Sequence, residues 1–167
     1  MRALAREMHV PPMTIYNYVP SREVLRGLVV DHVLGKISIP TPELGTWEER
    51  LHTLLSDARR VFVAHPGVLS ELGDKGSAET SRLAQAVLTI LRDGGFSDDD
   101  AVLCFATLFT FMTGQIDLDS MTVAMASGTA HATLEGVTES TQFSRDELFE
   151  FGFDTIIEGL KSKLLRN

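Results

Sequence analysis

The sequence has little cysteine, no closely spaced histidines and no long apolar run, and each shortage excludes a class of protein. Cys104 is the single cysteine among 167 residues, which excludes a disulfide framework and a cysteine-based zinc site. The five histidines never lie three or four residues apart, so they offer no helical metal pair. The most apolar window, residues 101–112, is shorter than the roughly 20 residues that span a bilayer. We therefore expect no metal, no cofactor and no membrane partner.

The patterns of an enzyme active site are also missing. We find no nucleophile–base pairing, no paired carboxylates and no glycine-rich phosphate loop, so no catalytic residues are assigned. The N-terminus lacks the apolar region of a secretory signal. Apolar residues make up 44% of the chain, far above the level of disordered proteins. A folded, non-enzymatic, cytoplasmic protein is the expectation.

Positive charge is scarce, and its distribution is uneven. The net charge of −8 argues against DNA binding, because DNA affinity comes largely from basic side chains that neutralise phosphates. Residues 1–36, however, carry five basic and three acidic residues, whereas residues 37–167 carry ten basic and twenty acidic residues. A net of +2 on a small N-terminal unit, beside −10 on the body, is typical of a DNA-binding segment joined to a non-DNA domain. The five basic residues of this unit equally fit an ordinary solvated surface.

Proline and glycine divide the chain into segments with helical spacing, and no strand alternation is found. The expected fold is all-α, with residues 1–36 as a small helix-turn-helix domain and connecting helix, and residues 37–167 as a larger helical domain. Helices are expected over residues 2–8, 12–18, 22–36, 47–65, 80–93, 98–114 and 144–165. Residues 117–142 are rich in small and hydroxyl side chains and predict a loop with one short helix at most.

Capping signals fix several helix starts. Ser21 and Ser97 precede helical segments, and Thr46 with Glu49 reads as a capping box. Ser144 with Glu147 repeats that box, and Phe143 can form a hydrophobic staple with Leu148. The run from residue 101 to residue 112 is apolar on almost every side, which predicts burial within the chain or against a second chain.

The first twenty residues have the spacing of a helix-turn-helix. A short helix ends at a tight turn and a second helix starts at Pro12. Ala5 is small enough for two helices to cross closely, and Val10 and Ile15 supply apolar contacts at the corner. Both tyrosines of the chain lie in the second helix, where they suit phosphate and thymine-methyl contacts or anchor a small core.

These residues resemble the helix-turn-helix of TetR-family transcriptional regulators. The runs Ile-Tyr-Asn-Tyr-Val at 15–19 and Ser-Arg-Glu-Val-Leu at 21–25 match the family's recognition-helix end and the following helix start. The layout of the body is similar to tetracycline-repressor-like ligand domains. Two features depart from the family: His9 stands where glycine is usual in the turn, and the family's first helix has no counterpart after Met1. We expect that helix to lie upstream of Met1, and its absence to expose Leu4, Ala5, Met8 and Ile15.

The resemblance implies three sets of site residues. The DNA-binding set is Pro12, Met13, Thr14, Tyr16, Asn17, Tyr18 and Arg22. The ligand-pocket set is Phe62, His65, Leu69, Leu83, Val87, Phe105, Phe109 and Met112, each of which equally suits plain core. The dimer-interface set is Phe149, Gly152, Phe153, Ile156, Gly159 and Leu160, with residues 98–114 as the second interface helix.

The sequence therefore predicts a ligand-responsive DNA-binding regulator. The expected partners are a palindromic double-stranded operator, a small apolar effector and a second copy of the chain. The expected action is repression, relieved when the effector releases the protein from DNA. The alternative is a dimeric helical small-molecule-binding protein without operator binding.

Overall fold

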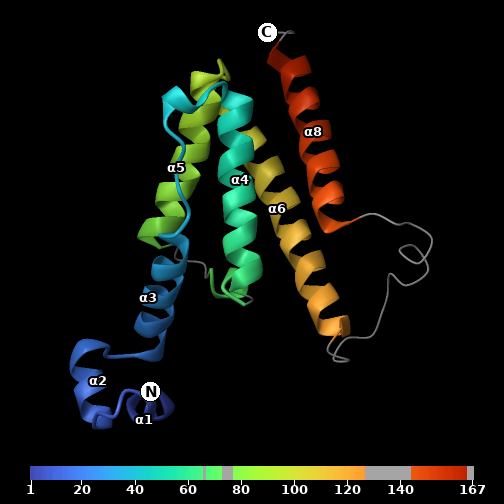
Figure 1. Ribbon diagram of the computed structural model, residues 1–167. Helices are drawn as coiled ribbons and strands as arrows, with labels where there is room; N and C mark the ends of the chain where they lie inside the picture. Colours follow the sequence, from blue (N-terminus) through green and yellow to red (C-terminus); the bar gives the residue numbers. More distant parts are fainter. Residues whose placement is uncertain (66, 73–76, 127–143, 165–167) are drawn as a thin grey trace.

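Figure 1 shows a computed structural model of the chain, and the structure describes residues 1–65, 67–72, 77–126 and 144–164. The described part contains helices and no strand, as the sequence predicts. The α-helices are α1 (Arg2–Glu7), α2 (Pro12–Tyr18), α3 (Arg22–Leu34), α4 (Trp47–Ala64), α5 (Ala78–Asp93), α6 (Asp98–Ala126) and α8 (Arg145–Leu164). Two short 3-10 turns, η1 (Pro42–Leu44) and η2 (Leu69–Glu71), lie between them.

The molecule has two parts joined by one helix (Figure 1). Helices α1 and α2 form the part that we term the head, residues 1–20, at one end of the molecule. Helices α4, α5, α6 and α8 form the bundle, in which α4 lies beside both α5 and α6 and α8 lies beside α6. Helix α3 runs from the head to the bundle and contacts α5 and α4.

The predicted caps start these helices. The Ser21 hydroxyl accepts from the Val24 N–H at 3.2 Å. The Thr46–Glu49 capping box is complete, since Glu49 Oε2 accepts from the Thr46 N–H at 2.7 Å and the Thr46 hydroxyl accepts from the Glu49 N–H. Each cap satisfies backbone donors that a helix leaves without partners in its first turn.

The later caps follow the same chemistry. Ser144 and Glu147 form the second box, and their pairing lowers the pKa of the Glu147 carboxyl. Ser97 accepts from the Asp100 N–H at 3.2 Å. The predicted staple partner Phe143 lies outside the described residues.

Several predicted boundaries were wrong: α3 ends at Leu34 rather than at residue 36, and α1 and α4 each end one residue early, at Glu7 and Ala64. Helix α5 begins at Ala78 rather than at residue 80, because Ser77 supplies the N-cap through a bond from the Thr80 N–H. Helix α6 continues to Ala126, although its sequence from residue 117 onward predicted a loop. The remainder of that predicted loop, residues 127–142, lies outside the described residues.

A continuous apolar core fills the bundle and includes the second half of α3, through Val30, Val33 and Leu34. Trp47 packs edge-on against Phe96 at 5.2 Å between ring centres. Gly94 permits that packing, because a Cβ there would lie 2.6 Å from Trp47 Cγ. In the described part of the chain, no helix is both long enough and apolar enough to cross a membrane.

Candidate functional site

The head is built around a close helix crossing. Ala5 on α1 and Ile15 on α2 are buried, and the Val10 N–H donates to the Ala5 carbonyl at 3.0 Å across the turn. The prediction that Ala5 and Ile15 would be exposed was therefore wrong, since the two short helices bury them against each other. Met8 is exposed, as expected.

The turn between α1 and α2 takes the left-handed backbone conformation at His9, with φ of 55°. A side chain other than glycine is disfavoured there, although histidine tolerates it better than most. The His9 ring stays close to its own turn, with Nδ1 2.9 Å from the Glu7 carbonyl oxygen. Pro12 then opens α2, because its missing N–H is not needed in a first helical turn.

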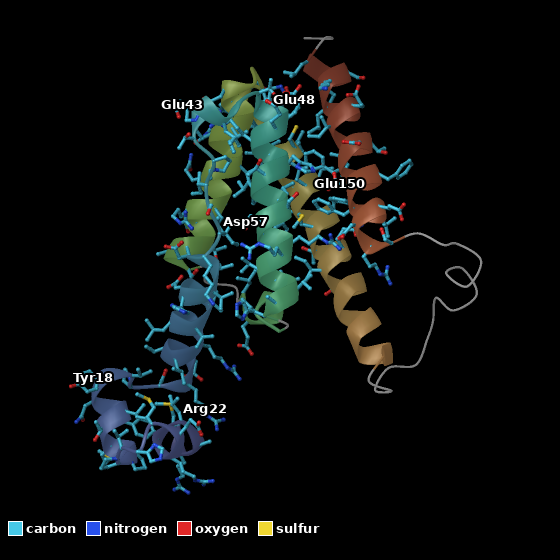
Figure 2. All side chains as sticks on the ribbon, in the orientation of Figure 1. Tyr18, Arg22, Glu43, Glu48, Asp57 and Glu150 are labelled. Atoms are coloured by element: carbon cyan, nitrogen blue, oxygen red, sulfur yellow. The ribbon has the colours of Figure 1, made fainter. Side chains whose placement is uncertain are left out.

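The outer face of α2 presents the predicted DNA-binding residues to solvent. Tyr18 is 83% exposed and Met13 69% exposed, while Thr14 is half-buried. The exposed members are Pro12, Met13, Tyr16, Asn17, Tyr18 and Arg22. Figure 2 shows Tyr18 and Arg22 at the α1–α2 end of the molecule, away from the bundle. Tyr16 and Tyr18 are thus surface residues rather than members of a small core.

The bundle contains a partly open apolar cavity of about 120 Å³ between α4, α5 and α6. Seven of the eight predicted pocket residues line it: Phe62, Leu69, Leu83, Val87, Phe105, Phe109 and Met112. Periodicity marked Leu54, Leu55 and Ala58 only as a core face, but they form the α4 wall. Leu34 of α3 also reaches the cavity, and no signal in the sequence distinguished it from ordinary core.

His65 does not belong to the cavity lining. Its Nε2 lies 3.1 Å from Lys36 Nζ, so the imidazole joins the end of α4 to the turn after α3. His65 caps the end of α4, where the chain turns toward η2. This predicted pocket residue thus makes a surface contact instead.

The cavity wall offers little polarity. Among the described lining residues, the polar side chains are Thr80 and Thr113, and none is charged. The Thr113 hydroxyl donates to the Phe109 carbonyl at 2.8 Å, and the Thr80 hydroxyl lies 2.9 Å from that of Ser77. Such a lining favours an uncharged, apolar occupant. An engineered apolar cavity of about 150 Å³ binds benzene, so the observed volume suits a molecule of that size and a larger one must move the walls.

Helix α8 is held on the bundle by its own apolar face. Phe149, Phe153 and Leu160 are buried within the chain, and Gly152 lets α8 approach the Phe111 ring, which would lie 2.5 Å from a Cβ at that position. Glu150 Oε2 lies 2.7 Å from His52 Nε2, and Asp146 accepts from Arg59 at 2.7 Å. Three of the predicted dimer residues, Phe149, Phe153 and Leu160, are therefore already packed within the protomer.

Within the four helices of the bundle, most of the exposed large apolar residues lie on α6. Val102, Leu103 and Phe109 are each half exposed there, and Phe151 of α8 is 73% exposed. Gly159 of α8 has no heavy atom within 4 Å of a Cβ placed on it. The apolar run of α6 is thus buried on one side only, which leaves the other side for a second chain.

These parts define a class of protein: a small two-helix head carried by one helix on an all-helical bundle with an apolar cavity. Comparison with known proteins identifies the family. The family described as "Tetracyclin repressor-like, C-terminal domain" matches residues 39–133, and the chain belongs to that family.

Individual relatives agree with this assignment. The class E tetracycline repressor protein of Escherichia coli is 23% identical, over 98% of this chain and 81% of the relative. The Streptomyces coelicolor TetR family protein ActR in complex with actinorhodin has a TM-score of 0.76 and 26% identity, over 98% of this chain and 87% of that one. BioQ of Mycobacterium smegmatis, solved with its double-stranded DNA operator, has the same fold. The TM-score is 0.69 and the identity 22%, over 96% of this chain and 84% of that one.

Proposed function

We propose that this chain is a ligand-responsive transcriptional repressor that binds a palindromic operator as a homodimer in the cytoplasm. A small apolar molecule in the cavity would release it from DNA. The observation that carries the proposal is the double role of α3, whose first residue follows the head and whose last residue, Leu34, lines the cavity. A change in cavity shape therefore acts on the helix that orients α2.

Recognition of DNA is assigned to the outer face of α2. Asn17 suits bidentate pairing with adenine, and Met13 and Thr14 suit contact with thymine methyls. Tyr18 and Arg22 are placed to hold phosphates, because both are exposed on the side that α2 presents. Pro12 and Tyr16 complete the surface. The low charge of the head predicts that affinity depends on few phosphate contacts.

The second copy is proposed to pack on the exposed face of α6, together with the outer side of α8. Val102, Leu103 and Phe109 supply the apolar area, and Gly159 and Phe151 supply the α8 side. Phe109 also lines the cavity, so a partner on this face would cover one side of the ligand site. Ile156, which is half-buried, remains a member of the proposed interface. The buried Phe149, Phe153 and Leu160 act by fixing α8 in place.

Regulatory function is supported by what the relatives bind. ActR has been solved with actinorhodin, and BioQ with its operator duplex. Apart from Leu34, the residues that line the cavity lie within the matched family region, and the apolar lining supports a small organic effector rather than an ion. The relatives are regulators, and the described residues of this chain hold no group of three or more metal-ligating side chains.

The test is selection of bound sequences from a random duplex pool by the purified protein, followed by anisotropy titration across salt concentrations. We expect a palindromic consensus and an affinity that falls with salt. Arg22→Ala should reduce the salt slope by about one, because one phosphate contact is lost. Arg26→Ala is the matched control, since Arg26 pairs with Glu71 at 3.3 Å and should leave the slope unchanged.

Two outcomes would contradict the proposal. Ligand binding with no salt-dependent selection of any duplex would establish the alternative, a small-molecule-binding protein without operator binding. An Asn17→Ala variant that keeps full discrimination at every operator position would remove α2 from the recognition surface, since a bidentate pair contributes about 1–3 kcal/mol.

A further inference from the structure

Helices α3 and α5 cap one another's ends. The Asp31 carboxylate of α3 accepts from the Glu79 N–H, in the first turn of α5, at 3.3 Å. In return, Arg82 of α5 donates from Nη2 to the Ile37 carbonyl at 3.2 Å and to the Leu34 carbonyl at 3.5 Å. The Glu79 N–H belongs to a first helical turn, which leaves such donors without partners inside the helix, and the Ile37 carbonyl lies just beyond the end of α3. The Leu34 carbonyl also accepts from the Ile37 N–H at 3.0 Å. Arg82 Nε also donates to Glu79 Oε2 at 2.5 Å, which fixes the guanidinium over this crossing.

The same stretch of α5 forms one wall of the cavity. Thr80, Leu83 and Ala84 line it, and Arg82 lies between them in the sequence. A shift of this wall therefore carries the guanidinium with it. The hydrogen bonds from Arg82 are already at or beyond the usual range of 2.7–3.2 Å for N–H···O. A further separation of roughly half an ångström would break them.

The opposite wall of the cavity, formed by α4, is linked to the turn after α3 by a shorter hydrogen bond. Asp57 of α4 accepts from the Ser38 N–H at 2.8 Å, and its neighbour Ala58 lines the cavity. The turn after α3, residues 35–38, is thus tied to α4 through Asp57 and to α5 through Arg82. The Lys36–His65 contact at 3.1 Å is a second link from this turn to α4. An occupant larger than about 120 Å³ that presses on both walls therefore strains the link to α5, which is the weaker one.

We propose that Arg82 and Asp31 form a joint, meaning the set of hydrogen bonds that holds the end of α3 against α5. Filling of the cavity breaks the Arg82 hydrogen bonds to the Leu34 and Ile37 carbonyls, and α3 can then change its orientation. This inference rests on the proposed function and names its coupling residues. Arg82 is a positioning residue, since it contacts neither the cavity nor the DNA-binding face. In the empty state the joint holds α3 and the head in one orientation. In the filled state α3 keeps the links of its following turn to α4 through Asp57 and His65, its Arg26–Glu71 ion pair and its apolar contacts, and the head samples other orientations.

The test measures head orientation without requiring DNA. Spin labels at Ala3→Cys on α1 and Thr89→Cys on α5 report the distance between the head and the bundle. Excess unlabelled protein ensures that each dimer carries one labelled chain. Burial raises the pKa of the Cys104 thiol, which therefore resists labelling and can be left in place.

The cavity is filled in two ways. N-phenyl-1-naphthylamine, an uncharged aromatic amine, reports its own entry into an apolar site by fluorescence. Ala58→Phe places a ring in the cavity from α4 and needs no ligand. We expect either change to broaden and shift the distance distribution of the otherwise unmodified chain.

Arg82→Met should show the broadened distribution with an empty cavity, and filling should not change it further. Asp31→Ala should do the same, whereas Arg82→Lys, which keeps a cation near the carbonyls, should restore part of the wild-type behaviour. The matched control is Arg92→Met on the same helix. Arg92 pairs with Asp98 at 2.6 Å beyond the far end of α5, and its loss should leave the response intact.

The outcomes separate the two proposals. An Arg82→Met chain that keeps the narrow distribution and responds to filling like the wild type would overturn the joint. Loss of the response in Arg82→Met together with failure to select any duplex would leave the joint standing and overturn operator binding. Where an operator is selected, the probe should weaken DNA binding by about 5–150-fold in the wild type, and by less than about 2-fold in Arg82→Met.

Discussion

The head and the bundle bury apolar side chains on very different scales. The head buries Ala5 and Ile15, and leaves Met8, Met13 and Tyr18 largely exposed. The bundle has a continuous core drawn from five helices. Helix α3 combines the two levels of burial. Its Val24, Leu28 and Val29 are about half exposed, whereas its second half lies in the core of the bundle. The bundle therefore fixes one half of α3, and the other half follows the head.

The largest expected effect tests whether the two parts unfold separately. Leu51→Ala removes a fully buried side chain from α4 and should lower the free energy of unfolding by about 2–5 kcal/mol. Urea unfolding followed by the fluorescence of Trp47, which lies in the bundle, measures this loss. Ile15→Ala should leave that transition within about 0.5 kcal/mol, because the change lies far from the bundle core.

The readout for Ile15→Ala is amide hydrogen exchange in α1 and α2, where protection should fall, together with weakened DNA binding. If Ile15→Ala instead shifts the Trp47 transition as much as Leu51→Ala, then head and bundle unfold as one unit and the comparison is wrong.

A second prediction probes how tightly the bundle is packed. Gly94→Ala would place a Cβ 2.6 Å from Trp47 Cγ, so overpacking should cost about 1–3 kcal/mol. The control is Gly114→Ala on α6, which meets no heavy atom within 4 Å and should stabilise the helix by about 0.5–1 kcal/mol. Thermal unfolding of the two variants should move in opposite directions, and equal shifts would contradict the packing described.

A third prediction concerns the tie between the bundle and the turn after α3. Burial opposes ionisation of Asp57, but the Ser38 N–H and Arg60 outweigh it and lower the pKa of the carboxyl below its ordinary value of 3.8. The stabilisation is therefore present above about pH 4 and is lost as the pH falls through the lowered pKa.

Asp57→Asn should cost about 1 kcal/mol at neutral pH and flatten the acid side of the stability profile. Urea unfolding at pH 7 and at successive steps below pH 4 measures both effects. Asp154→Asn, on the exposed side of α8, controls for the loss of one charge. An unchanged acid profile in Asp57→Asn would assign the pH dependence elsewhere.

The smallest expected effect lies in the head. His9→Gly relieves the left-handed backbone at φ of 55°, but it also frees the unfolded chain, so the net gain should be about 0.5 kcal/mol. Slower amide exchange across the turn between α1 and α2 would register it. His9→Ala should have the opposite sign, since alanine has neither the freedom of glycine nor a ring to place near the Glu7 carbonyl.

Local chemistry explains why most helix starts were predictable. Ser21, Thr46, Ser97 and Ser144 act through bonds within three residues, so the sequence contains all the information that each cap needs. The run after residue 116 is poor in bulky apolar side chains, and its continuation in α6 depends on a helix that was already started by other residues.

The sites show where pattern reasoning ends. Periodicity identified residues on the inner faces of the helices, and seven of the eight predicted pocket residues line one cavity. On α8, Phe149, Phe151 and Phe153 alternate, and spacing alone did not determine which face the protomer would cover. His65 was placed by type rather than by contact, whereas its partner Lys36 is 29 residues away. Contacts between distant segments decided each of these cases.

The length of α3 sets how sensitive the molecule is to small changes. Thirteen residues at 1.5 Å per residue make a rod of about 20 Å. A tilt of about 6° at its bundle end displaces the other end by roughly 2 Å, and a symmetric dimer doubles the change in separation to roughly 4 Å. DNA repeats every 34–36 Å, and base-edge hydrogen bonds tolerate only a few tenths of an ångström. If α3 transmits the response as proposed, a small movement near Leu34 produces a larger displacement of the recognition helix. The two recognition helices of a dimer would then no longer match the spacing of the DNA grooves.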